Sequence, residues 1–309
     1  MKLSLSLALC NNIEINLMRL LLLIFVFIFS QTIYSQESEQ IDSLWTKRGK
    51  AGVLLNQTGF SDWEGGGTNN FSGTLKFDYE WRYRYLGWDW LTNIESAFGL
   101  AKFKNAPFAR KIDDRILIQS IVGKKFTKNL SFSAFFNFNS QLGNGYKYSK
   151  DSENNEAREL KTRIFSPSYF QLGSGFLWKK DKKLWLNYSP IAARLILVSK
   201  KFTNNLNEDD SYYGVLKGKG SRYELGSNLT FHSEGKILEN VSYKQDLKLF
   251  SNYLDEPANI DLDYLIEIDL DVNPFLSTQL IMQFVYDDNS IARLQIREII
   301  GIGLQLKLN

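Results

Sequence analysis

The sequence predicts an all-β protein, a transmembrane antiparallel up-and-down β-barrel of about twelve strands that follows an N-terminal signal peptide. Three observations predict this fold. First, apolar and polar residues alternate through most of the chain after residue 48. Second, the connections between these segments are alternately short and long. Third, tryptophans lie beside the short connections. Short turns at one end and long loops at the other are typical of outer-membrane barrels.

The N-terminal segment predicts export. Arg19 precedes the apolar run LLLLIFVFIF, and small and polar residues return in SQTIYSQ. This order is typical of a secretory signal, and the run is shorter than the about 20 residues of a membrane-spanning helix. We predict a cleaved signal peptide over 1–35, a short periplasmic segment over 36–48 and the barrel over 49–309. An uncleaved anchor and a lipid on Cys10 are the alternatives.

The alternating segments predict strands with one apolar and one polar face. FSGTLKFDYEW (71–81) and IDLDYLIEIDLD (260–271) show the pattern most clearly. Their even number suits a closed antiparallel barrel. The predicted strands are 49–58, 71–81, 88–103, 115–124, 130–142, 164–178, 183–199, 221–232, 238–253, 260–272, 275–287 and 292–308.

The connections indicate how the barrel is oriented. Five of them are short, at 82–87, 125–129, 179–182, 233–237 and 272–274. Those between them include the long polar stretches that begin at Gly143 and Lys200. Since outer-membrane barrels keep their short turns on the periplasmic side, we predict both ends of the barrel chain there as well.

The length of the segments argues against a soluble β-sandwich, because soluble strands average about five or six residues and many of these are longer. A lysine or arginine facing lipid at the midplane costs about 2 to 4 kcal/mol, so the charged face should line the lumen. Glu298 is an exception, since it shares a face with Ile296 and Ile300.

Tryptophans flank two of the short turns. Amphipathic indole rings prefer the interface between membrane and water. We therefore predict a periplasmic girdle that consists of Trp81, Trp88, Trp90 and Trp178, whereas Trp185 is out of phase with the apolar residues beside it.

The most distinctive lumenal feature is an acidic row on the segment 260–272, made of Asp261, Asp263, Glu267, Asp269 and Asp271. One interpretation is a pore wall that attracts cations. The other is charge pairing across a narrow lumen. The candidate basic partners project from nearby segments and are Lys244, Lys248, Arg293 and Arg297.

The stretch NQTGFSDWEGGG (56–67) lacks the helix and the Lys-Ser or Lys-Thr pair of a phosphate-binding loop, and it leads into a strand. Its glycines suit a tight turn. LNQTGFSDWEGGGTNNFSG together with WDWLTNIESAFGLAKF resembles an uncharacterised Bacteroidota family, domain of unknown function 3078. The matching positions are Asn56, Trp63, Gly65, Gly66, Gly67, Trp88, Asp89, Gly99, Leu100 and Lys102. The resemblance implies an outer-membrane barrel and no assigned activity.

Catalytic residues are sparse, and we predict that the protein is not an enzyme. The sole histidine, His232, falls in the predicted turn 233–237 or at its edge, where it is expected to be solvated. A lipid hydrolase with a Ser-His pair is a remote alternative, because Ser233 has no evident partner there. We predict no cofactor and no metal site, since the acidic loops lack the spacing of an EF-hand. The net charge of only +3 predicts no nucleic-acid partner.

Two functions remain open at this point. The first is a narrow channel or transporter for small solutes or ions in the outer membrane of a Gram-negative bacterium, with the acidic row in its lumen. The second is a plugged structural barrel in contact with outer-membrane lipid. Its outward loops 143–163 and 200–220, or its periplasmic N-terminal segment, would bind other envelope proteins. An open or an occupied lumen distinguishes them.

Overall fold

The computed structural model describes residues 44–58, 68–104, 106–152, 155–208, 210–273, 275–290 and 292–308. The predicted signal peptide over 1–35 lies outside the described residues, as do Trp63, Gly65, Gly66 and Gly67 of the family motif. The barrel belongs to a compact unit, Leu44–Asn309. Its first strand begins at Trp45, four residues before the predicted start.

Twelve of the described strands form a closed barrel in which each strand pairs with its neighbours in chain order and the last pairs with the first. The predicted twelve-strand antiparallel barrel is therefore confirmed. Its strands are β1 (Trp45–Thr58), β2 (Asn70–Tyr85), β3 (Trp88–Phe103), β4 (Arg110–Lys125), β5 (Leu130–Ser140), β8 (Ser168–Lys179), β9 (Leu184–Leu197), β12 (Ser221–Leu238), β13 (Val241–Asn252), β14 (Ile260–Asp271), β15 (Leu276–Tyr286) and β16 (Gln295–Leu308).

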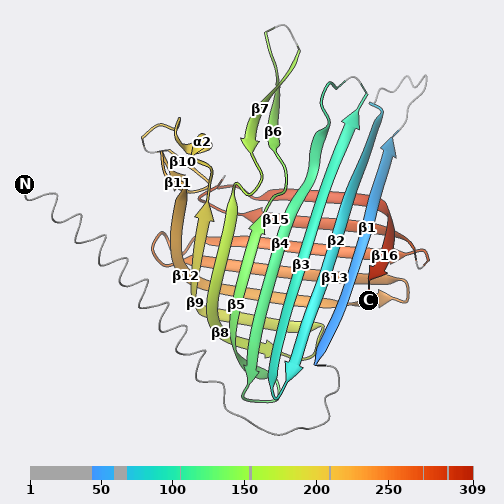
Figure 1. Ribbon diagram of the computed structural model, residues 1–309, viewed down its shortest axis with the longest axis vertical. Helices are drawn as coiled ribbons and strands as arrows, with labels where there is room; N and C mark the ends of the chain where they lie inside the picture. Colours follow the sequence, from blue (N-terminus) through green and yellow to red (C-terminus); the bar gives the residue numbers. More distant parts are fainter. Residues whose placement is uncertain are drawn as a thin grey trace, which may run out of the picture. The chain divides into compact units, whose positions relative to one another are not determined.

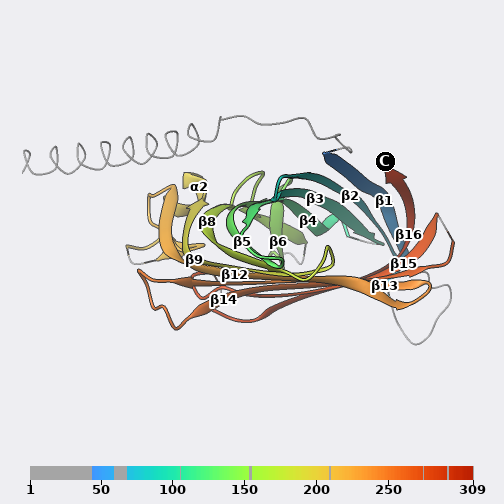
Figure 2. The same cartoon turned by 90° about the horizontal axis from the view of Figure 1, so that it is seen from below.

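Strands β1 to β5, β8 and β9 form a curved wall, and β13 to β16 run across behind it, so that the barrel is flattened (Figures 1 and 2). Side chains from the two walls therefore meet over short distances. Pairing is continuous from β1 to β2, where Trp45 lies opposite Tyr83 and Thr58 opposite Asn70. The pairing of β1 with β16 covers only Gly49–Leu55 and Ile302–Leu308.

The predicted turn at 233–237 is wrong. Residues 233–237 continue strand β12, and the chain reverses at Glu239 and Asn240 instead. Gly235 lies opposite Tyr243 in the register, and the tyrosine ring occupies the space a Cβ would need, 2.9 Å from it. The glycine thus marks close cross-strand packing by an aromatic side chain, a role that glycine has in strands as well as in turns.

The outward face of the barrel is apolar. Large side chains with more than half of their surface exposed stand on several strands, among them Phe71, Leu75, Phe132, Leu172 and Ile300. Apolar patches of this extent are uncommon on soluble monomers. The barrel strands have 11 to 18 residues, and about 9 to 11 tilted residues suffice to cross a bilayer. Among the described residues no helix has the length and hydropathy to cross a membrane.

The two long polar stretches contain structure of their own. The connection from β5 to β8 forms the hairpin β6 (Gly145–Lys150) and β7 (Glu156–Thr162), which projects beyond the barrel wall (Figure 1). The connection from β9 to β12 contains α2 (Lys200–Thr203) and the short pair β10 (Ser211–Tyr212) and β11 (Val215–Leu216).

The connection from β9 to β12 is packed against the end of the barrel. Val198 and Val215 are buried with Ile196 of β9, and the aromatic side chains of Tyr169 and Phe202 pack against them. This cluster covers part of the long-loop end of the barrel.

Candidate functional site

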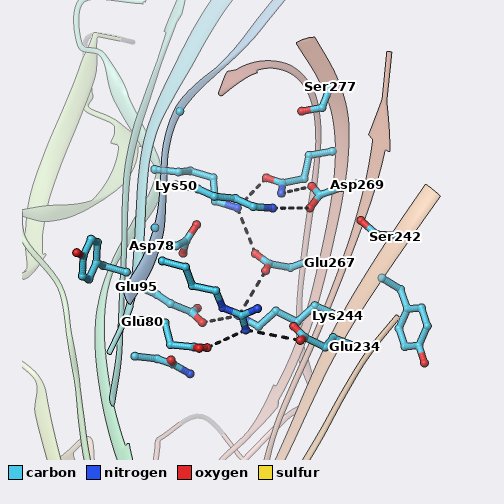
Figure 3. A pocket seen from close by; sticks show the side chains of 18 of the residues that line it. Lys50, Asp78, Glu80, Glu95, Glu234, Ser242, Lys244, Glu267, Asp269 and Ser277 are labelled. Atoms are coloured by element: carbon cyan, nitrogen blue, oxygen red, sulfur yellow. Dashed lines mark hydrogen bonds and ion pairs between the residues drawn. The ribbon is translucent and has the colours of Figure 1, made fainter. Parts of the chain in front are cut away.

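A chamber of about 500 Å³ lies inside the barrel, in the half that carries the short turns. Its walls come from β1, β2 and β3 on one side and from β12 to β16 on the other. Lys182 and Lys183 of the turn between β8 and β9 line its end. Charged side chains from both walls point into the chamber (Figure 3). Its volume is in the usual range of small-molecule sites.

A network of ion pairs centred on Glu267 of β14 crosses the lumen. The Glu267 carboxylate lies 3.2 Å from Lys76 Nζ of β2 and 3.2 Å from the Arg115 guanidinium of β4. Lys244 of β13 is 3.8 Å from Glu267 and also binds Glu95 of β3. These contacts join the two walls of the flattened barrel near its middle.

Two buried apolar clusters accompany this network. Leu54, Leu265 and Ile281 are buried together, and Ile299 packs against them. The second cluster contains Phe135, Ala192 and Phe250, with Ile121 packed against it. The small cavity between Trp185 and Thr230 holds only about 30 Å³, room for roughly one water molecule. Buried apolar contacts and ion pairs from both walls therefore occur together beside the chamber.

A further ion-pair cluster occupies the half of the lumen towards the long loops. Arg194 of β9 binds Glu224 of β12 and lies 2.5 Å from Asp261 of β14. Its guanidinium also stacks over the ring of Phe250, 4.1 Å from the centroid. Carboxylate oxygens of Asp261, Asp287 and Asp288 lie within 4.8 Å of one another. Of these three carboxylates, Asp261 is bound by Arg194, and Asp288 accepts hydrogen bonds from Asn259 and Asn289.

At the short-turn end the chamber has a basic mouth. Lys182 and Lys183 are exposed and make no ion pair with the described residues. Asp181 beside them accepts the backbone N–H of Lys183 (2.7 Å) and that of Leu184 (3.0 Å). The hydrogen bond from Lys183 holds the pKa of Asp181 below its ordinary value. The mouth therefore carries fixed charges of both signs with an excess of lysines.

His232 is not a solvated turn residue, so that prediction is wrong. It lies in β12 with only 7% of its surface exposed. Its Nδ1 is 2.7 Å from Asp246 Oδ1, and its ring stacks on Trp185 with centroids 5.1 Å apart. Trp185 points inward, consistent with its phase in the sequence. Neighbouring Ser233 shares a hydrogen bond with the Tyr243 hydroxyl (3.1 Å), so the two side chains do not form a nucleophile-base pair.

The predicted acidic row occupies positions along one face of β14. Asp263 accepts a hydrogen bond from Gln283 (2.7 Å), and Asp269 accepts one from Gln279 (2.5 Å). Asp261 and Glu267 are held by the arginine and lysine contacts described above. Asp271 is exposed at the end of the strand. Four members of the row therefore have polar partners within the lumen.

The predicted basic partners have different environments. Lys244 joins the Glu267 network, whereas Arg297 binds Asp113 of β4. Lys248 lies opposite Asp263 in the register of β13 and β14 without an ion pair among the described residues. Arg293 is exposed in the connection before β16. Sequence reasoning missed the partners Lys76, Glu95 and Arg115, which come from strands far away in the chain.

The tryptophans of the predicted girdle lie at the barrel surface, and Asn56 of the family motif lies at its seam. Trp88, Trp90 and Trp178 are exposed near the short-turn end, with 40%, 44% and 39% of their surface accessible, and Trp81 is partly buried. Trp45 extends this aromatic group, since its ring centroid is 6.1 Å from that of Trp90. Asn56 donates a hydrogen bond from Nδ2 to the Ile300 carbonyl (2.7 Å), across the seam between β1 and β16.

Comparison with known protein families finds a match for one part of the chain. Residues 55–146 match the family described as "Protein of unknown function (DUF3078)". The match confirms the predicted resemblance for residues 55–146, which run from the end of β1 into the hairpin of β6 and β7. No curated protein sequence matches the chain.

The solved structures with a similar fold are membrane barrels, and their sequences have low identity to this chain. The translocator domain of the autotransporter NalP from Neisseria meningitidis is 8% identical with a TM-score of 0.38, over 86% of this chain and 90% of that one. An outer-membrane channel from Pseudomonas putida F1 is 9% identical with a TM-score of 0.37, over 89% of this chain and 98% of that one.

Proposed function

We propose that the protein is an outer-membrane β-barrel of a Gram-negative bacterium whose lumen is closed near its middle and whose chamber binds a small polar solute from the short-turn, periplasmic side. The network around Glu267 carries this proposal. It joins strands of both walls, and two buried apolar clusters accompany it. An open pore requires a continuous polar path, and contacts of these two kinds across the lumen support a closed one.

Charge pairing favours a closed lumen over a permanently open pore in which the acidic row selects cations. The carboxylates at 261, 263, 267 and 269 are engaged by arginines, lysines or glutamines. An acidic row raises the local cation concentration most strongly when its charges are not neutralised by adjacent cations. Here the neighbouring cations lie close enough to remove much of that potential.

A gated passage for small cations is the second candidate. The observation that favours it is the chain of exchangeable partners around Lys244, which lies 3.8 Å from Glu267 and 3.7 Å from Asp246. Movement of such side chains would leave a polar path through the ring of strands. We place catalysis outside the proposal, because His232 and Ser233 each have another partner.

Thiol labelling tests the closed lumen and its open chamber. In a Cys10→Ser background, which removes the only cysteine of the sequence, we expect Ser242→Cys to react readily with a charged maleimide added to detergent-folded protein. Ser242 lines the chamber, whereas Thr230 lies beyond Trp185 and has 8% of its surface exposed. Thr230→Cys should therefore react at least about tenfold more slowly, because it is reached only after local opening.

Unfolding in denaturant provides the control, since both cysteines should then react at similar rates. Equal labelling of the two variants in the folded protein would contradict a closed lumen. Protection of Ser242→Cys in the folded protein would contradict an accessible chamber.

A further inference from the structure

We propose that the chamber recognises a small zwitterionic amine of the size of a short peptide, with its ammonium group bound by Asp78. This inference rests on the proposed function and specifies the class of solute. It depends on three features of the chamber: one carboxylate without a partner, a basic mouth, and the volume between them.

Asp78 of β2 faces the chamber and makes no hydrogen bond or ion pair with the described residues (Figure 3). Its neighbours in the register are Lys50 of β1 and Glu95 of β3. Lys50 extends instead towards Asp269, at 3.9 Å, and Glu95 is bound by Lys244. Two carboxylates therefore stand side by side on one wall, and Lys244 of the opposite wall forms its ion pair with Glu95 and not with Asp78.

The other acidic side chains of the chamber are engaged. Glu80 accepts a hydrogen bond from Arg48 (2.8 Å), and the same guanidinium lies 3.6 Å from Glu234. Glu267 and Asp269 are held by lysine, arginine and glutamine side chains as described above. A cation that enters the chamber can therefore bind Asp78 without displacing a cation from an existing ion pair.

The opposite charge stands at the entrance. Lys182 and Lys183 line the chamber at the turn between β8 and β9, and Lys236 lines it from the end of β12. A simple cation is repelled by these lysines on entry, whereas a simple anion meets the carboxylate pair of Asp78 and Glu95 inside. A solute with an ammonium at one end and a carboxylate at the other complements both regions.

The volume limits the size of the solute. About 500 Å³ accommodates a tripeptide, which spans roughly 10 Å when extended. The walls offer neutral polar groups for the rest of such a molecule, including Asn93, Ser242 and Ser277. Large oligosaccharides and folded partners are excluded from a chamber of this size.

Three probes of equal backbone length test the inference: triglycine, N-acetyltriglycine and triglycine amide. Binding to the folded protein is measured by isothermal titration calorimetry. Triglycine should bind most tightly. Acetylation of its amine should weaken binding by about tenfold or more, the loss of one charge-assisted hydrogen bond, and amidation should weaken it by a smaller factor because the mouth lysines lose a carboxylate partner.

Asp78→Asn identifies the residue that binds the ammonium group. It should weaken triglycine binding by about tenfold and leave N-acetyltriglycine binding unchanged. The variant should fold as well as the wild type, because Asp78 has no ion pair to lose and stands beside Glu95. Asp255→Asn is the matched control, since it changes the net charge equally in the long-loop half, where Asp255 binds Arg222.

The inference is overturned if N-acetyltriglycine binds as tightly as triglycine, if triglycine gives no binding heat, or if Asp78→Asn binds triglycine with unchanged affinity. The labelling of Ser242→Cys separates these failures from failure of the proposed function. A labelled chamber that does not distinguish the probes refutes the solute class alone. A chamber closed to the maleimide refutes the proposed function as well.

Discussion

Replacing Glu267 with glutamine is expected to lower the free energy of unfolding by about 3 to 5 kcal/mol, the usual effect of leaving buried charges without their partner. The carboxylate has 12% of its surface exposed and is shared by Lys76 and Arg115, each 9% exposed. Arg115 has no other ion pair among the described residues, and its Nε and Nη1 lack hydrogen-bond partners. The change therefore leaves a buried guanidinium without an anion.

Denaturant unfolding in lipid vesicles, followed by tryptophan fluorescence, measures this loss. Glu298→Gln is the matched control, because Glu298 is exposed on the outward face of β16 and makes no ion pair in the described structure. It should leave the stability unchanged or raise it. In the background of Glu267→Gln, Arg115→Met should recover part of the loss, since it removes the unpaired cation. A Glu267→Gln barrel as stable as the wild type would show that the network does not hold the walls together.

Replacing Leu75 with arginine should destabilise the barrel by about 2 to 4 kcal/mol in a bilayer, the effect of a lipid-facing arginine near the midplane. Leu75 lies near the middle of β2 and has 61% of its surface exposed on the outward face. In a soluble barrel the same substitution would place a charge in water and would have an effect within about 0.5 kcal/mol. Unfolding in vesicles and folding yield into vesicles measure the difference.

Leu254→Arg is the matched control for this experiment. Leu254 is equally apolar and 69% exposed, and it lies in the connection between β13 and β14 at the long-loop end. This variant should behave like the wild type. Equal stability of the Leu75→Arg and Leu254→Arg proteins would contradict a membrane-embedded outer face.

The barrel could be predicted from sequence because its causes are local. Alternation with a period of two residues decides which side chains share a face of a strand. The lengths of the connections distinguish the short-turn end of the barrel from its long-loop end. The misplaced turn at 233–237 shows the limit of this reasoning. Ser233 and Gly235 are usual turn residues, but here Tyr243 on the next strand packs over the glycine, a contact that no local pattern contains.

The ion pairs could be predicted only in part. The acidic face of β14 follows from alternation, but the flattening of the barrel decides which strands lie opposite it (Figure 2). Glu267 meets Lys76 and Arg115 from β2 and β4, 191 and 152 residues away in the chain. Arg297, which the sequence places near the acidic row, binds Asp113 of β4 instead.

The same distance in sequence explains His232. Its burial depends on Trp185 of β9 and Asp246 of β13, the strands on either side of β12. A turn at 233–237 would end β12 at His232, so that Asp246 of β13 would not lie opposite the histidine. With β12 extended to Leu238, alternation alone places His232 on the same face as Thr230 and Glu234, towards the lumen.

Single-channel conductance of the purified, folded wild-type protein in a planar bilayer, under a salt gradient, tests the closed lumen most directly. The ion pairs around Glu267 and the apolar clusters beyond them predict no steady current from protein whose folding is shown by its resistance to denaturant. Steady, cation-selective current steps from the wild-type protein would contradict a closed barrel and would establish the acidic row as the wall of an open pore.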